Sequence, residues 1–329
     1  MSKFVRAAQT SQSLSLVAME EASRLGVREA DIEHLLLALV LNDQKAGRAL
    51  RGLGVDIEAA RQAVAEQHDT HLASLGIDAE FPAPGRIVFH ETDGYQWRKR
   101  ASDLLARSAG MGRDGDAGAV LRELLIEPSG LIVEILERLD VTPQHVQAEL
   151  DRLDAAPASG GVREEVGRGR VSGSTETFVP APIADVWEFL TDVSRVPDWD
   201  VSVGSIDHVE RGGAPGSVWE GRAPHERPDG RRLKLKPQYR RRVIELVEAD
   251  APDRVTWRSS YPDVAHRGPT QTTFVLAPTT GGTQITITTS WARSRGWRRV
   301  VGVPLRPIVK FIVWLSLFQT GGAVSRAFR

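Results

Sequence analysis

The stretch EEASRLGVREADIEHLLLAL, residues 20–39, sets the fold expected for the first half of the chain. A pair of acids and a run of small residues lead into a leucine-rich segment, with Glu33 at the start of its helix. Leucines and alanines recur at helical spacing from here to residue 154, and such apolar stripes become buried when helix packs against helix. The pattern predicts an all-α domain over residues 1–154.

An internal repeat divides this helical half. LLLALVLNDQKAGRALRGLGVD (35–56) matches VLRELLIEPSGLIVEILERLDV (120–141). In each copy one helix ends at a polar turn and a second follows. A third then begins at Asp56 or Thr142, whose side-chain oxygens can cap the new helix. The expected boundaries of the two repeats are about 4–70 and 90–154.

These segments resemble the double N-terminal domain of Clp-family ATPases, above all in AMEEASRLG (18–26), EHLLLALV (33–40) and ALRGLGVD (49–56). Such domains recognise substrates, adaptors and certain antibiotics, and some bind phosphoarginine through the glutamate of a Thr-Glu-His turn.

Glu33 and His34 match that turn in the first repeat, where Ile32 replaces the threonine. We place Ala119 and Val120 at the equivalent positions of the second repeat, which lacks the glutamate. The resemblance therefore implies partner binding through Glu33 and His34. The expected partner is a peptide, a component of the Clp system or a Clp-targeting antibiotic.

No ATPase motor is expected from this sequence. It contains no G-x-x-x-x-G-K-[ST] segment, whose amides and lysine would cradle the phosphates. His68 and His71, with Asp69 between them, offer too few ligands for a metal site. The chain has no cysteine, so thiolate ligands and disulfides are excluded. We predict no metal and no cofactor.

The segment AAPASGGVREEVGRGRVSGS, residues 155–174, separates two halves of different texture. Glycine, serine, proline and charge crowd it without apolar periodicity, which is typical of a flexible linker. After it, Val, Ile, Thr and Trp alternate with polar residues, as in strands. The predicted strands lie near 203–211, 216–223, 231–247, 254–261, 270–278 and 282–291, and the last helix near 304–328.

This second half is similar to the START-like superfamily, most closely to its polyketide cyclase/dehydrase and lipid-transport group. The resemblance rests on APIADVWEFLTDVSRVPDWD (181–200), GAPGSVWEGR (213–222), ADAPDRVTWR (249–258) and GGTQITIT (281–288). It implies an α+β helix-grip domain over residues 175–329, with a cavity between a curved antiparallel sheet and the long C-terminal helix.

Aromatic residues suit such a cavity to a hydrophobic ligand, because ligand pockets are mostly lined by apolar and aromatic groups. Seven of the eight tryptophans follow residue 174. We expect an apolar or amphipathic small molecule. The residues expected to form the cavity wall are Trp219, Trp257, Trp291, Phe311 and Leu315.

Charge is divided unevenly, with a net −8 over residues 1–154 and +7 over the remainder. The basic segment RRLKLKPQYRRR (231–242) alternates like a half-buried strand with its cations outward. Tyr239 is its single aromatic residue, so nucleic acid is not the expected partner. The apolar run at 300–318 is interrupted by Pro304, Arg306, Pro307 and Lys310, which favours a buried helix. A membrane surface is a less favoured alternative.

Three functions remain open. The favoured one is a non-enzymatic protein of two binding modules, expected in the cytoplasm because residues 1–13 lack the apolar core of a signal peptide. The second is a cyclase/dehydrase-type enzyme, although its acid and base candidates form no spacing-defined motif. The third is a decoy that sequesters a Clp-targeting antibiotic. The acid and base candidates are Asp198, Asp200, His208, His225 with Glu226, and His266.

Overall fold

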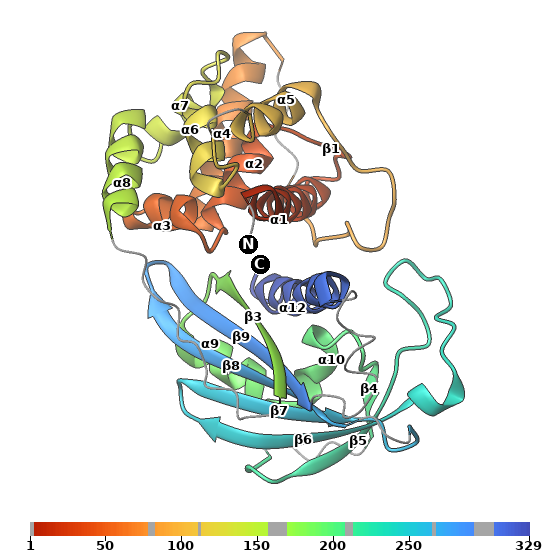
Figure 1. Ribbon diagram of the computed structural model, residues 1–329. Helices are drawn as coiled ribbons and strands as arrows, with labels where there is room; N and C mark the ends of the chain where they lie inside the picture. The colour runs from red at the N-terminus through yellow and green to blue at the C-terminus, as the bar shows by residue number, and fades with distance from the viewer. Residues whose placement is uncertain are drawn as a thin grey trace. The chain divides into compact units, whose positions relative to one another are not determined.

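The structure, a computed structural model, describes residues 3–77, 83–110, 113–156, 170–207, 213–264, 268–292 and 306–329. The chain divides into two compact units, Met1–Ala158 and Ser159–Arg329 (Figure 1). We call them the helical unit and the helix-grip unit. Of the expected linker, residues 157–169 lie outside the described residues, and residues 170–174 already form the start of a strand.

Helices and one short pair of parallel strands make up the described part of the helical unit. In chain order these are α1 (Lys3–Arg24), β1 (Glu29–Ala30), α2 (Ile32–Val40), α3 (Lys45–Gly52), α4 (Ile57–Ser74), β2 (Gln96–Trp97), α5 (Lys99–Ser108), α6 (Ala117–Leu125), α7 (Leu131–Glu137) and α8 (Pro143–Ala155). Helix α2 is buried along its whole length, because its leucines pack against neighbouring helices on several sides.

The helix caps fix how the two repeats correspond. Asp56 and Thr142 cap α4 and α8, as predicted, and stand 86 positions apart. Helices α2 and α6 are capped by Asp31 and Asp116, only 85 positions apart. The difference arises because the turn that follows α6 is one residue longer than the turn that follows α2.

This offset corrects the alignment expected from the sequence. Counted from the caps, the equivalents of Glu33 and His34 are Gly118 and Ala119, one position earlier than the pair Ala119 and Val120. The second repeat therefore has neither a carboxylate nor an imidazole at these positions.

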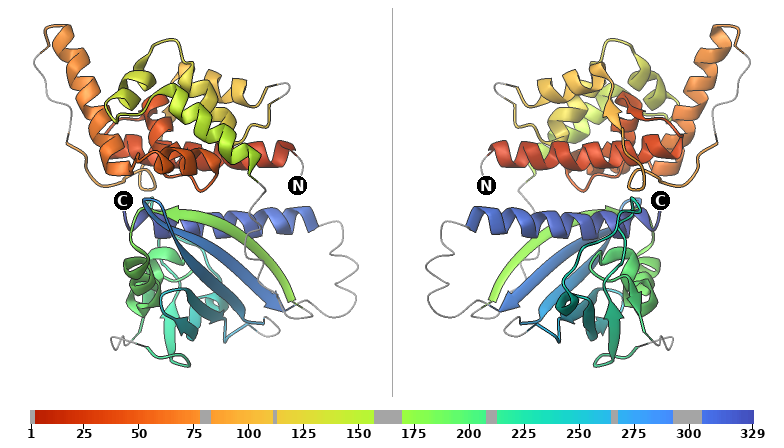
Figure 2. Two further views of the ribbon diagram at one scale, coloured as in Figure 1. Left: turned by 90° about the vertical axis from the view of Figure 1, so that its left-hand side faces the viewer. Right: turned by 90° about the vertical axis from the view of Figure 1, so that its right-hand side faces the viewer.

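A seven-stranded antiparallel sheet with strand order β3-β9-β8-β7-β6-β5-β4 forms the helix-grip unit. Its strands are β3 (Arg170–Val179), β4 (Ser205–Ile206), β5 (Val218–Arg222), β6 (Arg241–Asp250), β7 (Arg254–Ser260), β8 (Thr270–Thr279) and β9 (Gly282–Ala292). Its helices are α9 (Ile183–Thr191), α10 (Val196–Trp199) and α12 (Arg306–Arg326), with short 3-10 turns at Val193–Arg195 and Pro237–Tyr239. Figure 2 shows α12 lying along the concave side of the curved sheet, which is the expected helix-grip arrangement.

One predicted strand is much shorter than expected. The sequence predicts a strand over 231–247, yet β6 begins only at Arg241. Pro237 lacks the N–H that a ladder requires, and a 3-10 turn forms there instead. The predicted strand at 203–211 is observed as the two residues of β4, and its residues 208–211 lie outside the described residues.

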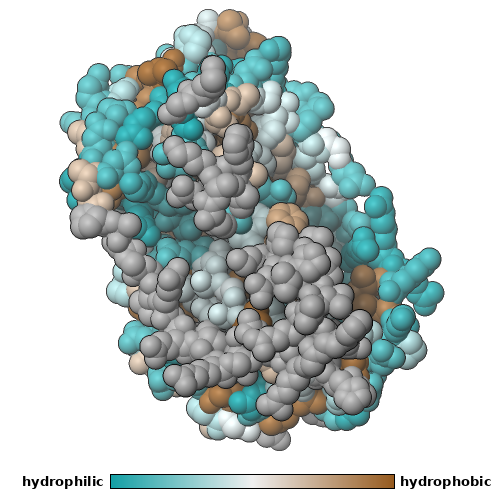
Figure 3. All heavy atoms as spheres, in the orientation of Figure 1, coloured by the Kyte–Doolittle hydropathy of each residue, from teal (hydrophilic) through white to brown (hydrophobic). Residues whose placement is uncertain are grey.

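A close approach holds α12 against the edge strand β3. A Cβ atom on Gly173 would lie 2.5 Å from Cγ1 of Val313, so the absence of a side chain lets the helix approach the strand. Leu317 of α12 joins the buried cluster that α9 and α10 complete over the inner sheet face. On the face of the chain drawn in Figure 3, hydrophilic residues predominate among the coloured spheres and hydrophobic ones occur in small groups, as expected when most large apolar side chains are buried.

Candidate functional site

The start of α2 is a fully formed capping box. The side chain of Asp31 accepts from the backbone of Ile32 and of His34, and the backbone N–H of Asp31 donates to Nδ1 of His34 at 3.2 Å. Both side chains are buried. This reciprocal bonding satisfies amides that the first turn of a helix leaves without partners. It also fixes the position of Glu33, which lies between the two bonded residues in that turn.

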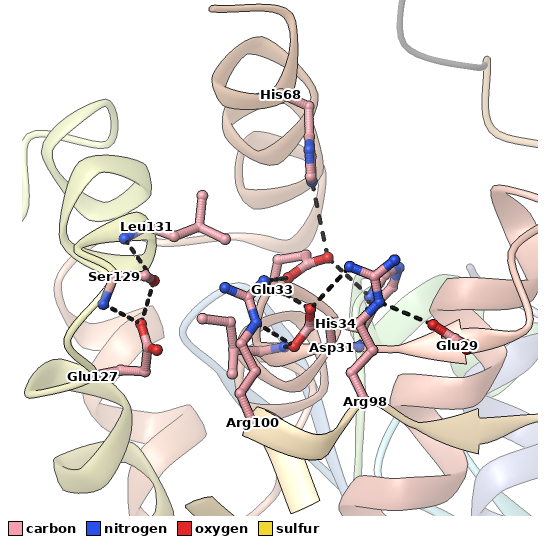
Figure 4. A network of polar contacts seen from close by, with 11 residues as sticks. Glu29, Asp31, Glu33, His34, His68, Arg98, Arg100, Glu127, Ser129 and Leu131 are labelled. Carbon is pink, nitrogen blue, oxygen red and sulfur yellow. Dashed lines mark hydrogen bonds and ion pairs between the residues drawn. The ribbon is translucent and has the colours of Figure 1, made fainter. Parts of the chain in front are cut away.

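The short strand pair brings two arginines to this helix start. Parallel pairing of Glu29 with Gln96 and of Ala30 with Trp97 places Arg98 and Arg100 beside the acids that follow β1. Nε and Nη2 of Arg100 each lie 2.7 Å from a carboxylate oxygen of Asp31. Nη1 of Arg98 lies 3.6 Å from the same carboxylate (Figure 4). The hydrogen bond to Asp31 raises the pKa of Arg100.

Glu33 lies deeper than these arginines. Its Oε2 is 3.6 Å from Nη2 of Arg100, and its Oε1 is 3.9 Å from Nε2 of His68, which points down from α4 (Figure 4). Within the part of the chain that the structure describes, Oε2 of Glu33 and Nε2 of His34 are buried without a hydrogen-bond partner. Burial lowers the pKa of His34, although the nearby carboxylates of Glu33 and Asp31 oppose this effect. A buried carboxylate and imidazole with unused bonding capacity can accept and donate to a ligand.

The second repeat offers no such arrangement. Asp116 caps α6 by accepting from the backbone of Ala119 at 2.8 Å. Gly118 and Ala119 then follow in place of the glutamate and the histidine. The two sequence-predicted partner residues, Glu33 and His34, therefore lie together at one helix start, in the first repeat.

Aromatic rings gather on the inner face of the helix-grip sheet. The ring of Trp257 lies 6.3 Å from that of Trp199 and 6.0 Å from that of Trp219, measured between centroids. Nε1 of Trp257 donates to the backbone oxygen of Leu190 at 2.9 Å, which locks α9 to the sheet. Trp257 is buried, and Trp219 is partly exposed beside it.

The other three expected wall residues differ in exposure. Trp291 shares the inner face with Ile287 and is partly exposed near the end of β9. Leu315 is partly buried, whereas Phe311, near the start of α12, is 56% exposed. Rings of Phe311, Trp314 and Phe318 follow one another along α12, and the last two are stacked.

Arg242 is a buried cation whose position the sequence did not predict. The predicted alternation placed the cations of 231–242 outward, but Arg242 is buried on the inner face with Ile244 and Leu246. Its guanidinium lies 3.9 Å from the ring centre of Tyr261. Its two-residue spacing from those apolar residues was the signal that could have revealed this.

The acid and base candidates are dispersed. Asp198 pairs with Arg195 at 3.1 Å, and Asp200 accepts from the backbone of Ser202, so both support the turns after α9. His225 is exposed in the loop after β5. His208 and His266 lie outside the described residues. Among the residues that are described, no group of three or more His, Cys, Asp or Glu could hold a metal ion.

A known family model matches part of each unit. Residues 8–82 match the Clp repeat N-terminal domain, and residues 170–312 match the family of polyketide cyclase/dehydrase and lipid transport. The chain joins a Clp repeat domain to a polyketide cyclase/dehydrase-type domain. Both predicted resemblances are confirmed.

Individual relatives are distant. The chloroplastic chaperone protein ClpC1 of Oryza sativa subsp. japonica is 25% identical over 209 residues, which span 63% of this chain and 21% of the chaperone. The di-domain ARO/CYC StfQ from the steffimycin biosynthetic pathway is 14% identical with a TM-score of 0.35, covering 66% of this chain and 61% of its own. Protein Ms6760 from Mycobacterium smegmatis is 15% identical with a TM-score of 0.32, covering 48% and 90%. None of the described helices is long and apolar enough to cross a membrane.

Proposed function

We propose that this chain is a two-module binding protein. Its helical unit docks an arginine-bearing peptide or adaptor at the start of α2, and its helix-grip unit holds an apolar or amphipathic small molecule. The observation that carries the first part is the pair of 2.7 Å contacts from Arg100 to Asp31, with Glu33 at 3.6 Å. A guanidinium of the chain itself already lies where the arginine of a partner would bind.

The charge and exposure of the site support this proposal. The carboxylates of Asp31 and Glu33 are buried, whereas the side chain of Arg100 is 39% exposed and lies over them. A partner's arginine can exchange with Arg100 without any change in the fold of α2. Paired charge-assisted hydrogen bonds between guanidinium and carboxylate are about twice as strong as neutral ones, so the exchange gives a selective contact.

The test of the first module is calorimetric titration of a short blocked peptide that carries one arginine, against the same peptide with lysine. Lysine cannot bind a carboxylate with a two-pronged fork, so the arginine peptide should bind more tightly. Glu33→Gln should weaken it by about tenfold, corresponding to about 1.4 kcal/mol. Glu58→Gln, which removes the same charge from the first turn of α4, is the matched control and should have little effect. Equal losses in the two variants would mean that the effect is one of net charge, and the proposed site would be wrong.

The second module is supported by the inner sheet face. Trp219 and Trp291 are partly exposed there, and Phe311 extends the apolar surface along α12. Aromatic side chains supply large contact areas to a ligand. The wall residues proposed for this site are Trp219, Trp257, Trp291, Phe311 and Leu315.

A fluorescent lipid-like probe tests this module. Leu315→Asp and Phe311→Asp should each abolish its binding, because a charge placed against an apolar ligand must be desolvated. Val218→Asp is the control. Val218 is 57% exposed, about as much as Phe311, but it lies on the outer face of the sheet. If the Leu315→Asp variant folds and still binds the probe with unchanged affinity, the proposed location of the ligand site is wrong.

A further inference from the structure

A hollow of about 420 Å3 lies at the outer side of the helix-grip sheet, beside its β4 edge. Its lining includes Glu220, Arg222, His225, Leu233, Leu235 and Arg240. We propose that it is a second binding site, for a small amphipathic organic anion such as a medium-chain carboxylate. The site is separate from the ligand site proposed on the inner face.

Strand geometry separates the two sites. Trp219 pairs with Ile244, and both lie on the inner face with the buried cluster. Successive residues of a strand point to opposite faces, so Glu220 and Arg222 point outward. Arg241, which pairs with Arg222, shares that outer face. A molecule bound in the hollow would therefore contact the side of the sheet opposite the tryptophans.

The segment that follows β5 supplies the apolar part of the hollow. The backbone N–H of Ala223 donates to the oxygen of Arg240, and that of Leu233 donates to the oxygen of His225, each at 2.8 Å. These bonds close residues 223–240 into a hairpin loop between β5 and β6, whose two leucines line the hollow together with residues of both strands. Leu233 and Leu235 are only partly buried, although they are the two leucines of a strongly basic stretch. An apolar chain bound between them would complete their burial, and removing apolar surface from water favours binding.

Charge pairing leaves one cation in the hollow available to a ligand. Arg222 donates to Asp207 at 3.1 Å, and Arg241 makes two hydrogen bonds to Glu220. The bonds from Arg241 lower the pKa of Glu220, which keeps this pair ionised. Arg240 has neither an ion pair nor a side-chain hydrogen bond among the described residues, and it faces the same hollow. Its guanidinium fork matches the geometry of a carboxylate.

Size and charge together select the class of ligand. Ligand pockets commonly measure about 300 to 1,000 Å3 and combine apolar lining with a few placed polar groups. The hollow lies within this range, and its lining has an apolar part, Leu233 and Leu235, and a polar part that includes Arg240 and His225. A carboxylate on a short apolar chain satisfies both parts, whereas a neutral alcohol of equal length satisfies only the leucines.

The experiment uses the full-length chain, octanoate as the probe and octanol as its neutral counterpart. Binding is followed by amide chemical shifts, since the N–H groups of Ala223 and Leu233 hold the hollow together and should report its occupation. Octanoate should shift both amides, and octanol should bind about tenfold more weakly, the difference that one charge-assisted contact of about 1.4 kcal/mol produces. Equal affinities for octanoate and octanol would overturn the proposal.

Four variants locate the site. Arg240→Gln should reduce octanoate affinity by about tenfold, whereas Arg227→Gln, on the same loop but outside the lining, should not. Leu235→Ala should weaken octanoate and octanol alike. Leu315→Asp, which tests the inner face, should leave the octanoate-induced shifts of Ala223 and Leu233 unchanged. If Leu315→Asp abolished those shifts, or if Arg227→Gln matched Arg240→Gln, the outer site would be wrong, while the proposed inner site would still stand on its own test.

Discussion

The backbone N–H of Asp31 donates a hydrogen bond to Nδ1 of His34, 3.2 Å away. An imidazole nitrogen accepts only when it carries no proton, so the capping box requires neutral His34. Burial lowers the pKa of His34, which keeps the ring neutral in the folded helical unit. The cap and the neighbouring acid site therefore depend on pH.

The first prediction is a loss of stability on acidification. The folded pKa of His34 lies below its ordinary value of 6.5, so the unfolded chain takes up a proton that the folded chain does not. The contribution of His34 to the free energy of unfolding is complete above pH 6.5 and is lost as the pH falls below that value. Between pH 7.5 and 5.5 the loss should be at most about 1.4 kcal/mol, if the folded ring stays neutral.

His34→Gln should remove this part of the pH dependence, because glutamine at the third position can complete a capping box without titrating. Chemical denaturation of wild type and variant at both pH values measures the difference. The same substitution at exposed His145, the third residue of α8, controls for the removal of one imidazole. A pH dependence identical in wild type and His34→Gln would contradict the prediction.

The second prediction concerns competition at the start of α2. If Arg100 takes the place of a partner's arginine, then Arg100→Gln should raise the affinity of an arginine peptide by about tenfold, since no internal guanidinium has to leave. The neighbouring Lys99 pairs with Asp103 in the same helix, so Lys99→Gln removes the same charge away from the acids. Calorimetry on both variants distinguishes competition from net charge. Equal affinity for wild type and Arg100→Gln would show that Arg100 does not compete.

The third prediction concerns the packing of α3. A Cβ atom on Gly47 would lie 1.9 Å from the backbone oxygen of Asn42 and 2.6 Å from Nη1 of Arg51. Arg51 is buried and donates to that same oxygen at 2.9 Å. Gly47→Ala should therefore destabilise the helical unit by about 1–3 kcal/mol, as overpacking does.

Gly52, in the same helix, provides the control for Gly47. Its added Cβ would meet only the side chain of Glu149, at 3.3 Å, and alanine normally favours a helix over glycine by about 0.5–1 kcal/mol. Gly52→Ala should thus be neutral or stabilising in thermal unfolding. If both variants unfolded at the same temperature, the tight contact at Gly47 would not be a determinant of stability.

The fourth prediction links a helix contact to ligand binding. Gly173→Val should push α12 away from β3, because Val313 leaves no room for a side chain. The helix-grip unit should lose about 1–3 kcal/mol of stability and bind a lipid-like probe more weakly. Gly268→Ala, whose Cβ would meet only Cβ of Ala292 at 3.6 Å, should change neither property. Probe binding and thermal unfolding of the two variants measure the outcome, and full binding by Gly173→Val would contradict it.

Periodicity predicted the elements well where one pattern dominated. The leucine run of α2 and the alternation of β9 each have a single interpretation, and both elements formed as expected. The segment 231–240 has the alternation of a strand but contains Pro237, and the proline decided the outcome. The repeat was recognised, but its register at α6 was misplaced by one residue because only the helix caps reveal the longer turn.

The candidate site was predicted less completely. The resemblance predicted Glu33 and His34. No sequence feature near them predicts Arg98 and Arg100, which lie beside them because strand β2 pairs in parallel with β1. Long-range pairing of this kind leaves no periodic signal. The outer hollow was also missed, because its charged residues look solvated in sequence and only the folding back of 223–240 joins them to the sheet.

The tryptophan cluster has an optical consequence. Indole rings separated by 6.0 and 6.3 Å, and inclined to one another by 50° in both pairs, couple their electronic transitions and generate strong near-ultraviolet circular dichroism. Trp219 forms one of these pairs with Trp257 and is the partly exposed member of the cluster. A ligand that reorients the indole ring of Trp219 would alter the circular dichroism of this pair. The pair formed by Trp199 and Trp257 would remain in place. The helix-grip unit thus contains an intrinsic spectroscopic reporter, and compounds can be screened against the unmodified chain without a dye.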